Sequence, residues 1–263
     1  MHSTDRERLI SDLLRHRGFV SFQELQSKLD ASPATIRRDL ERMAEVGALA
    51  RIRGGAKAAG DAERANGSIG APHLSGVPFH ENQNRHAAQK AAIGKAAAAL
   101  CTAGEGIMID GGSTTLQMCP HLASLNLQVL TNSLHIVNAL LPQAGTRIMV
   151  PAGAVFREQN IILAAAGEQS MPRFHAPKLF MGAAAIGSQG LMQADMLLVA
   201  AERRLIERAE EIIVLVDSSK FLISSGMVVC GLEEIDTVIT DDGISKNERK
   251  ILEGAQIRVI VAG

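Results

Sequence analysis

The sequence contains no tryptophan and no tyrosine, and aromatic residues make up only 3% of its 263 positions. Because 46% of the residues are hydrophobic, we still expect a sizeable core, built from alanine, valine, isoleucine, leucine and methionine. The three cysteines lie far apart without Cys-x-x-Cys or Cys/His spacing, and the eight histidines are scattered. We therefore expect reduced, buried thiols, no metal site and no cofactor.

Long apolar runs and a strong net charge are also missing. No run is long enough to span a bilayer, and the first 20 residues are charged throughout, unlike a signal peptide, so we expect a cytoplasmic protein. The net charge is −1, but residues 1–57 carry 11 Lys and Arg against 8 Asp and Glu, and the remainder carries 16 against 20. A modestly basic first segment on an acidic body is compatible with a DNA-binding module joined to a sensor.

Residues 1–57 predict three short helices followed by a β wing. Thr4 and Glu7 have the spacing of a capping box, Ser32 is a suitable N-cap, and Gly47 is expected to end the third helix. Apolar residues recur at helical spacing in each helix: Leu9, Ile10, Leu13 and Leu14, then Phe22, Leu25 and Leu29, then Ile36, Leu40 and Met43. This order predicts a winged helix-turn-helix domain.

The outer face of the third predicted helix carries a hydroxyl and several arginines. Arginine binds phosphate groups or guanine edges, so such a helix suits the major groove of DNA. A packing or dimerisation unit is the alternative, with Arg37, Arg38 and Asp39 forming a solvated, ion-paired face. The capped helices and basic wing, occurring in order, favour DNA binding. The predicted DNA contacts are Ser32, Thr35, Arg37, Arg38, Arg42, Arg51 and Arg53.

Residues 58–78 are rich in small and polar residues without an apolar period, which indicates a linker. In residues 79–263, helical stretches then alternate with short apolar runs. This alternation predicts a largely parallel sheet covered on both faces, and hence a three-layer α/β domain. The runs are 106–109, 128–130, 147–150, 179–181, 212–216, 237–239 and 257–261.

Polar or Gly-rich residues follow several of these runs, where open α/β sheets bind their ligands. The segment Asp110–Thr115 is the most informative, because its glycines allow close approach and its hydroxyls precede a predicted helix whose start favours phosphate. It matches neither a P-loop nor a dinucleotide fingerprint. An ordinary strand–helix turn with a Ser/Thr cap is an equally good interpretation.

Three charged residues beyond this segment are compatible with either ligand binding or surface pairing. Lys220 could bind a phosphate or carboxylate, or pair with Asp217 in a solvated loop. Asp195 could bind ligand hydroxyls or belong to a surface pair. Glu202 precedes several arginines and is expected on a solvated helix face.

Two stretches of the first domain, Ser32-Pro33-Ala34-Thr35-Ile36-Arg37-Arg38-Asp39-Leu40 and Arg51-Ile52-Arg53-Gly54-Gly55-Ala56, resemble the DeoR family of bacterial transcriptional repressors. The second domain resembles the sensor domain of that family at residues 109–115, 130–133, 216–221 and 239–241. The resemblance implies a fold like that of ribose-5-phosphate isomerase and the CoA transferases. It also implies a phosphorylated sugar or related intermediate as effector.

The effector site that we predict comprises Asp110, Gly111, Gly112, Ser113, Thr114, Thr115, Asn132, Gly153, Asp195 and Lys220. The chain departs from the family pattern at Gln193–Met196, where the family often has Asn-x-x-Glu. There the chain is closer to the branch that regulates ascorbate utilisation. It departs again at Pro177-Lys178, where the family commonly has an aspartate. These departures make a sugar acid an alternative effector.

We therefore expect a regulator, a repressor of a carbohydrate-utilisation operon, that binds a double-stranded operator as a homodimer or homotetramer. The alternative is a sugar-phosphate isomerase or transferase with an accessory N-terminal domain, in which Asp110, Asp195 and Lys220 would be the acid/base groups. A metabolic enzyme needs neither an arginine-bearing helix nor a basic wing. The sequence therefore favours the regulator, and no enzymatic activity is expected.

Overall fold

The computed structural model describes residues 3–17, 19–29, 31–45, 48–52, 55–58, 79–164 and 170–263. Chain contacts divide the molecule into two units, Met1–Pro72 and His73–Gly263. The predicted linker, 58–78, falls outside the described residues except for its first position. Within the described residues, no helix has the length and apolar character needed to cross a membrane.

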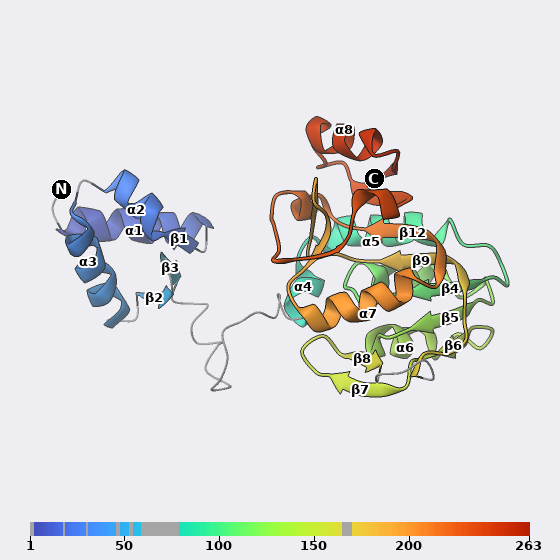
Figure 1. Ribbon diagram of the computed structural model, residues 1–263. Coiled ribbons are helices and arrows are strands. Elements are labelled where there is room, and N and C mark those ends of the chain that lie inside the picture. The colour runs from blue at the N-terminus through green and yellow to red at the C-terminus, as the bar shows by residue number, and fades with distance from the viewer. Residues whose placement is uncertain are drawn as a thin grey trace. The chain divides into compact units, whose positions relative to one another are not determined.

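The first unit is a small helical domain with an antiparallel sheet, as the sequence predicts (Figure 1). Its helices are α1 (Ser3–Arg17), α2 (Phe22–Lys28) and α3 (Pro33–Glu45), and its strands are β1 (Phe19–Ser21), β2 (Leu49–Ile52) and β3 (Gly55–Ala58). The sheet order is β1-β3-β2. The hairpin β2–β3 is the predicted wing, and β1 was not predicted because three residues show no detectable alternation. The apolar stripes meet in one core: Ile10, Leu14, Val20, Leu25, Leu29, Ile36, Leu40, Met43, Leu49 and Ala56.

The second unit contains, in its described part, a seven-stranded sheet with the order β15-β14-β12-β9-β4-β5-β6. All of its strand pairs are parallel. Every strand coincides with an apolar run of the sequence, which confirms the predicted parallel sheet. The strands are β4 (Gly106–Ile109), β5 (Gln128–Thr131), β6 (Arg147–Met149), β9 (Ala176–Met181), β12 (Ala209–Leu215), β14 (Thr237–Asp241) and β15 (Arg258–Ala262).

Both faces of this sheet are covered, so the unit has the three predicted layers. Successive residues of a strand point to opposite faces, and Ile107 and Ile109 accordingly join one core while Met108 joins the other. On one face lie α5 (Ala87–Ala98), the 3-10 helix η3 (Thr115–His121) and α6 (Leu134–Leu140). On the other lie α7 (Met196–Ile206), α8 (Lys246–Gly254) and a small antiparallel sheet of β10 (Ala185–Gly187), β11 (Gly190–Gln193) and β13 (Met227–Cys230).

Several short elements complete the unit and were not predicted, because each is too short to show a period. They are α4 (Phe79–Asn84), the antiparallel hairpin β7 (Gly153–Phe156) and β8 (Ile161–Ala164), and the 3-10 helices η5 (Ser218–Phe221) and η6 (Leu232–Glu234). Of these, α4 and η5 both contribute residues to the cavity described below.

Candidate functional site

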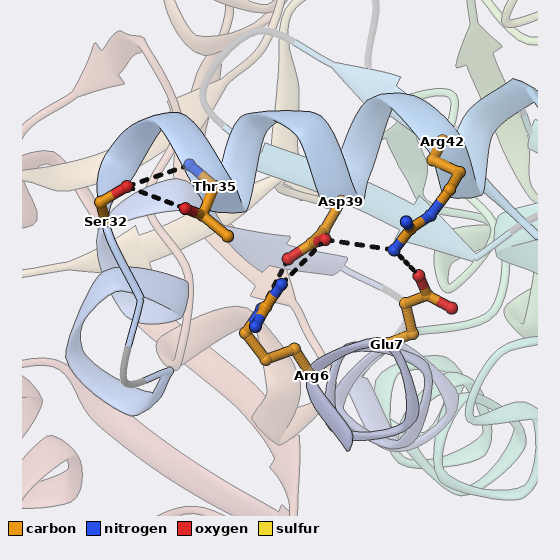
Figure 2. Close-up of polar contacts among 6 residues, drawn as sticks. All are labelled: Arg6, Glu7, Ser32, Thr35, Asp39 and Arg42. Atoms are coloured by element: carbon orange, nitrogen blue, oxygen red, sulfur yellow. Dashed lines mark hydrogen bonds and ion pairs between the residues drawn. The ribbon is translucent and has the colours of Figure 1, made fainter. Parts of the chain in front are cut away.

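Helix α3 of the first unit begins at the predicted cap. The Ser32 Oγ accepts a hydrogen bond from the Thr35 amide at 3.2 Å and lies 2.9 Å from the Thr35 Oγ1 (Figure 2). Pro33 occupies the first helical position, where its missing N–H costs nothing. This cap fixes the start of a helix whose exposed side carries Arg37 and Arg38.

The inner side of α3 is fastened to α1 by a buried ion pair. Asp39 is only 3% exposed, and it accepts from the Arg6 Nε at 2.7 Å and from the Arg6 Nη2 at 3.2 Å. The hydrogen bond to Asp39 raises the pKa of Arg6. Arg42 joins this network through Asp39 and Glu7 (Figure 2). The two helices are therefore held by charge as well as by apolar contact.

The predicted DNA contacts fall into three groups. Ser32, Arg37 and Arg38 are exposed, Thr35 is half-buried, and the Arg37 guanidinium lies 5.2 Å above the centre of the Phe22 ring. Arg42 is exposed but bound to the network between α1 and α3. The Arg51 backbone belongs to β2, whereas its side chain, like the whole of Arg53, lies outside the described residues.

In the second unit, a cavity of about 240 Å³ lies at the carboxyl ends of the four central strands. Asp110 follows β4, Asn132 follows β5, Gly182 follows β9, and Lys220 lies in η5 just after β12. Because these strands are adjacent and parallel, the segments that follow them meet at one edge of the sheet. The predicted residues that line the cavity are Asp110, Gly111, Gly112, Ser113, Thr114, Asn132 and Lys220.

Three predicted site residues do not line this cavity. Thr115 is fully buried, and its hydroxyl donates to the carbonyl oxygens of Asp110 and Gly112 at 2.8 and 3.0 Å. Gly153 lies in β7, where a Cβ would meet the Leu163 carbonyl oxygen at 1.8 Å. Asp195 caps α7 by accepting from the Leu197 amide at 2.8 Å. In the structure, Thr115 and Asp195 therefore form hydrogen bonds with backbone groups, and Gly153 allows a close approach of two backbone segments.

Asn132 holds the loop after β4 in place. Its Nδ2 donates to the Asp110 Oδ1, and its Oδ1 accepts from the Gly111 amide, both at 3.0 Å. The element that follows the loop is the seven-residue η3, which contains Pro120, rather than the regular helix expected. A short 3-10 helix has a small dipole. Affinity for an anion must therefore come mainly from side chains and loop amides.

Lys90 is a buried cation that the sequence analysis missed, and it supports the cavity wall through its bonds to the lining residues Ser113 and Asn82. It lies on α5 with 1% exposure, and its Nζ donates to the Ser113 Oγ at 3.0 Å and to the carbonyl oxygen of Asn82. Burial lowers the pKa of Lys90 to about 8, an effect that the charge of Lys220 reinforces and that of Asp217 opposes. Lys90 lies three residues before Ile93 and seven before Ala97, and so on the apolar stripe of α5. This spacing could have predicted from the sequence that Lys90 is buried.

Lys220 and Asp217 lie next to this buried lysine. Burial lowers the pKa of Lys220, while the charge of Asp217 raises it. Asp217 is 1% exposed, and its Oδ1 accepts from the Ser219 amide at 3.2 Å. Lys90, Lys220 and Asp217, which we call the cationic group, form one electrostatic unit with a net positive charge when both lysines are protonated.

The expectation of a solvated Glu202 was wrong. Glu202 is 3% exposed and lines the cavity from α7, because that helix packs its inner face against β11 and β12. The Gln193 Nε2 donates to its Oε1 at 2.5 Å. Burial and the nearby charge of Asp110 raise the pKa of Glu202 well above its usual value, and burial likewise raises the pKa of Asp110. Asp110 and Glu202 form what we call the carboxyl pair.

Two family models match this chain. Residues 6–61 match a DeoR-like helix-turn-helix domain, and residues 85–242 match a DeoR C-terminal sensor domain. The HTH-type transcriptional regulators UlaR of Shigella dysenteriae and of Escherichia coli strain SMS-3-5 are each 29% identical over 261 residues, with 99% of both chains covered.

Similar solved structures include a probable sor operon regulator from Shigella flexneri. It has a TM-score of 0.41 and 11% identity, with 66% of this chain and 90% of that chain covered. Ribose 5-phosphate isomerase A from Methanocaldococcus jannaschii has a TM-score of 0.38 and 18% identity, with 50% and 53% covered. These scores are too low to carry an argument.

Proposed function

The chain belongs to the DeoR family of DNA-binding transcription regulators, and on that premise we propose that it represses carbohydrate-utilisation genes under the control of a phosphorylated, sugar-like effector. The observation that carries the proposal is the cavity at the ends of adjacent parallel strands, which is lined by Lys220 of the cationic group and by both members of the carboxyl pair. An isomerase or transferase is not favoured, since the matching family models describe a DNA-binding domain and a sensor domain.

For the DNA-binding unit, we propose that α3 enters the major groove. Its capped start and the exposed Arg37 and Arg38 support this role, because the first turns of a recognition helix contact base edges and phosphates. Arg51 and Arg53 are proposed to contact phosphates from the wing. Arg42 is proposed to act mainly by holding α3 against α1.

Replacing Arg38 tests this placement. The Arg38→Ala variant is expected to bind operator DNA with about 5- to 150-fold lower affinity, since one base-reading arginine contributes about 1–3 kcal/mol. A mobility-shift titration at fixed salt measures the loss. Because Arg38 is exposed, effector affinity and melting temperature should stay at the wild-type values. Unchanged DNA affinity would show that α3 does not face the groove.

For the sensor unit, we propose that the cationic group and the amides of Gly112–Thr114 bind the phosphate. The carboxyl pair, with Gln193, is proposed to bind the hydroxyls. Lys220 lines the cavity from η5, whereas Asp110 follows β4 and Glu202 lies on α7, so the cation and the two carboxyls reach the cavity from different elements. A ligand with an anionic group at one end and hydroxyls at the other matches this separation.

We further propose that the regulator acts as a homodimer or homotetramer. Two DNA-binding units would then occupy half-sites about 34–36 Å apart, or a multiple of that spacing. An effector that binds one arrangement of the sensor units more tightly shifts the population toward it, and so changes how the DNA-binding units are presented.

The Lys220→Ala variant tests the phosphate end of the cavity. Loss of one charge-assisted hydrogen bond should weaken phosphorylated sugars by roughly 10- to 150-fold. The measurement is a thermal-shift titration of the full chain, because a bound ligand raises the melting temperature. Lys250→Ala, at an exposed position of α8, is the matched control and should behave as wild type. A normal effector response in Lys220→Ala would reject this phosphate site.

A further inference from the structure

The two carboxyl groups of the carboxyl pair approach the cavity from different layers. Asp110 follows β4 in the sheet, and Glu202 lies on α7. Both are 3% exposed, and they are close enough for the charge of Asp110 to affect Glu202. Within the described residues, neither forms an ion pair with a lysine, arginine or histidine. Each therefore lacks the partner that usually stabilises a buried carboxylate.

The hydrogen bonds of the pair leave one buried oxygen of Glu202 without a partner in the described part of the chain. Asn132 donates to Asp110, and Gln193 donates to the Glu202 Oε1. The Glu202 Oε2 is buried and has no hydrogen-bond partner among the described residues. Glu202 lines the cavity, so its carboxyl group has unused hydrogen-bonding capacity in the cavity wall.

Building on the proposed function, we propose that Asp110 and Glu202 determine which phosphorylated compounds act as effectors, by accepting a neutral, hydroxylated end and rejecting a carboxylate there. Two neighbouring buried carboxyls cannot both ionise without a large cost, so Glu202 keeps its proton. A protonated carboxyl at Glu202 can donate a hydrogen bond to a ligand, while a carboxylate at Asp110 accepts one from a ligand hydroxyl. Sugar alcohol phosphates and sugar phosphates fit this arrangement.

A carboxylate at the same end of the ligand would meet the charge of Asp110 in a site shielded from water. Lys220, which lines the cavity from η5, is assigned to the phosphate of the same ligand and so does not offset this repulsion. A repulsion of about 1.4 kcal/mol corresponds to a tenfold ratio of affinities. We therefore expect a preference of about tenfold or more against the acid.

The binding experiment uses two phosphates that differ only at this end. Glucitol 6-phosphate has a hydroxymethyl group where 6-phosphogluconate has a carboxylate. Titration calorimetry of the full chain is expected to show tighter binding of glucitol 6-phosphate. Equal binding, or tighter binding of the acid, would overturn the selection while leaving the phosphate site intact. If neither compound binds, the proposed phosphate-binding function fails together with the selection.

Variants of α7 test the state of Glu202. Glu202→Gln keeps the size and a neutral donor, so affinity for glucitol 6-phosphate is expected to stay within about threefold of wild type. Glu207→Gln, at an exposed position just after α7, is the control. A loss greater than about tenfold in a folded Glu202→Gln protein would mean that the wild-type carboxyl is ionised, contrary to the proposal.

An NMR measurement on the ligand-free protein also tests whether Glu202 is protonated. The side-chain carboxyl carbon of Glu202 is followed by carbon NMR in the full chain and assigned by its loss in Glu202→Gln. At pH 7 its chemical shift is expected to be that of a protonated acid. A shift of the ionised form at pH 7 overturns the inference, whichever compounds bind.

Discussion

The Asp39→Ala variant is expected to bind the operator with an affinity lower by about 100-fold or more, because its DNA-binding unit unfolds while the sensor unit stays folded. Asp39 accepts from both Arg6 and Arg42, so its removal takes away the buried carboxylate that these two guanidinium groups share at the junction of α1 and α3. Removing one partner of a buried pair costs more than the pair contributes. A small domain with a single core cannot absorb that loss.

Calorimetry and the mobility-shift assay together measure this effect. The transition of the first unit should move to lower temperature or vanish, while that of the second unit and its effector affinity stay unchanged. Arg38→Ala is the matched control on the same helix, since it should lose DNA affinity at wild-type stability. An Asp39→Ala protein with wild-type stability would show that apolar packing alone holds α1 against α3.

The secondary structure and core of each unit could be predicted from the sequence where a residue pattern repeats. Every strand of the parallel sheet coincides with an apolar run, because strands buried on both faces need continuous apolar sequence. The stripe Ile36, Leu40 and Met43 is buried in the core of the first unit for the corresponding helical reason. Strand β1 and the small sheet of β10, β11 and β13 could not be predicted, since they depend on partners distant in sequence.

The residues of the candidate site that follow strands were predicted from the sequence, whereas those that lie on helices were missed. Asp110, Asn132 and Lys220 follow central strands and line the cavity, whereas Gly153 follows β6, which lies at the edge of the sheet. Strand order is not encoded in any local pattern, so this distinction needed the structure. Lys90 and Glu202 were missed because charged helix residues usually face water, and only the packing of α5 and α7 shows that these two do not.

The Lys90→Met variant is expected to lose the response to effector, with phosphate affinity lower by roughly 10- to 100-fold. Methionine fills similar space and stays buried, so the variant should remain folded. Lys90 in the wild type has a lowered pKa, and the deprotonated form cannot bind an anion. Wild-type affinity should therefore fall as pH rises through about 8, a pKa that is lowered mainly by burial and adjusted by the charges of Asp217, Lys220 and Arg85.

The lowered pKa of Lys90 also makes the stability of the ligand-free protein depend on pH, in the opposite direction to the affinity. The folded pKa of Lys90 is about 8 and the ordinary value is 10.5, so the unfolded chain binds more protons between these values. The contribution of Lys90 to stability therefore rises with pH across that window. Both pH effects should disappear in Lys90→Met and persist in Lys95→Met, an exposed position on the same helix. A Lys90→Met protein that still binds phosphate with the wild-type pH profile would remove Lys90 from the cationic group and leave Lys220 as the cation of the site.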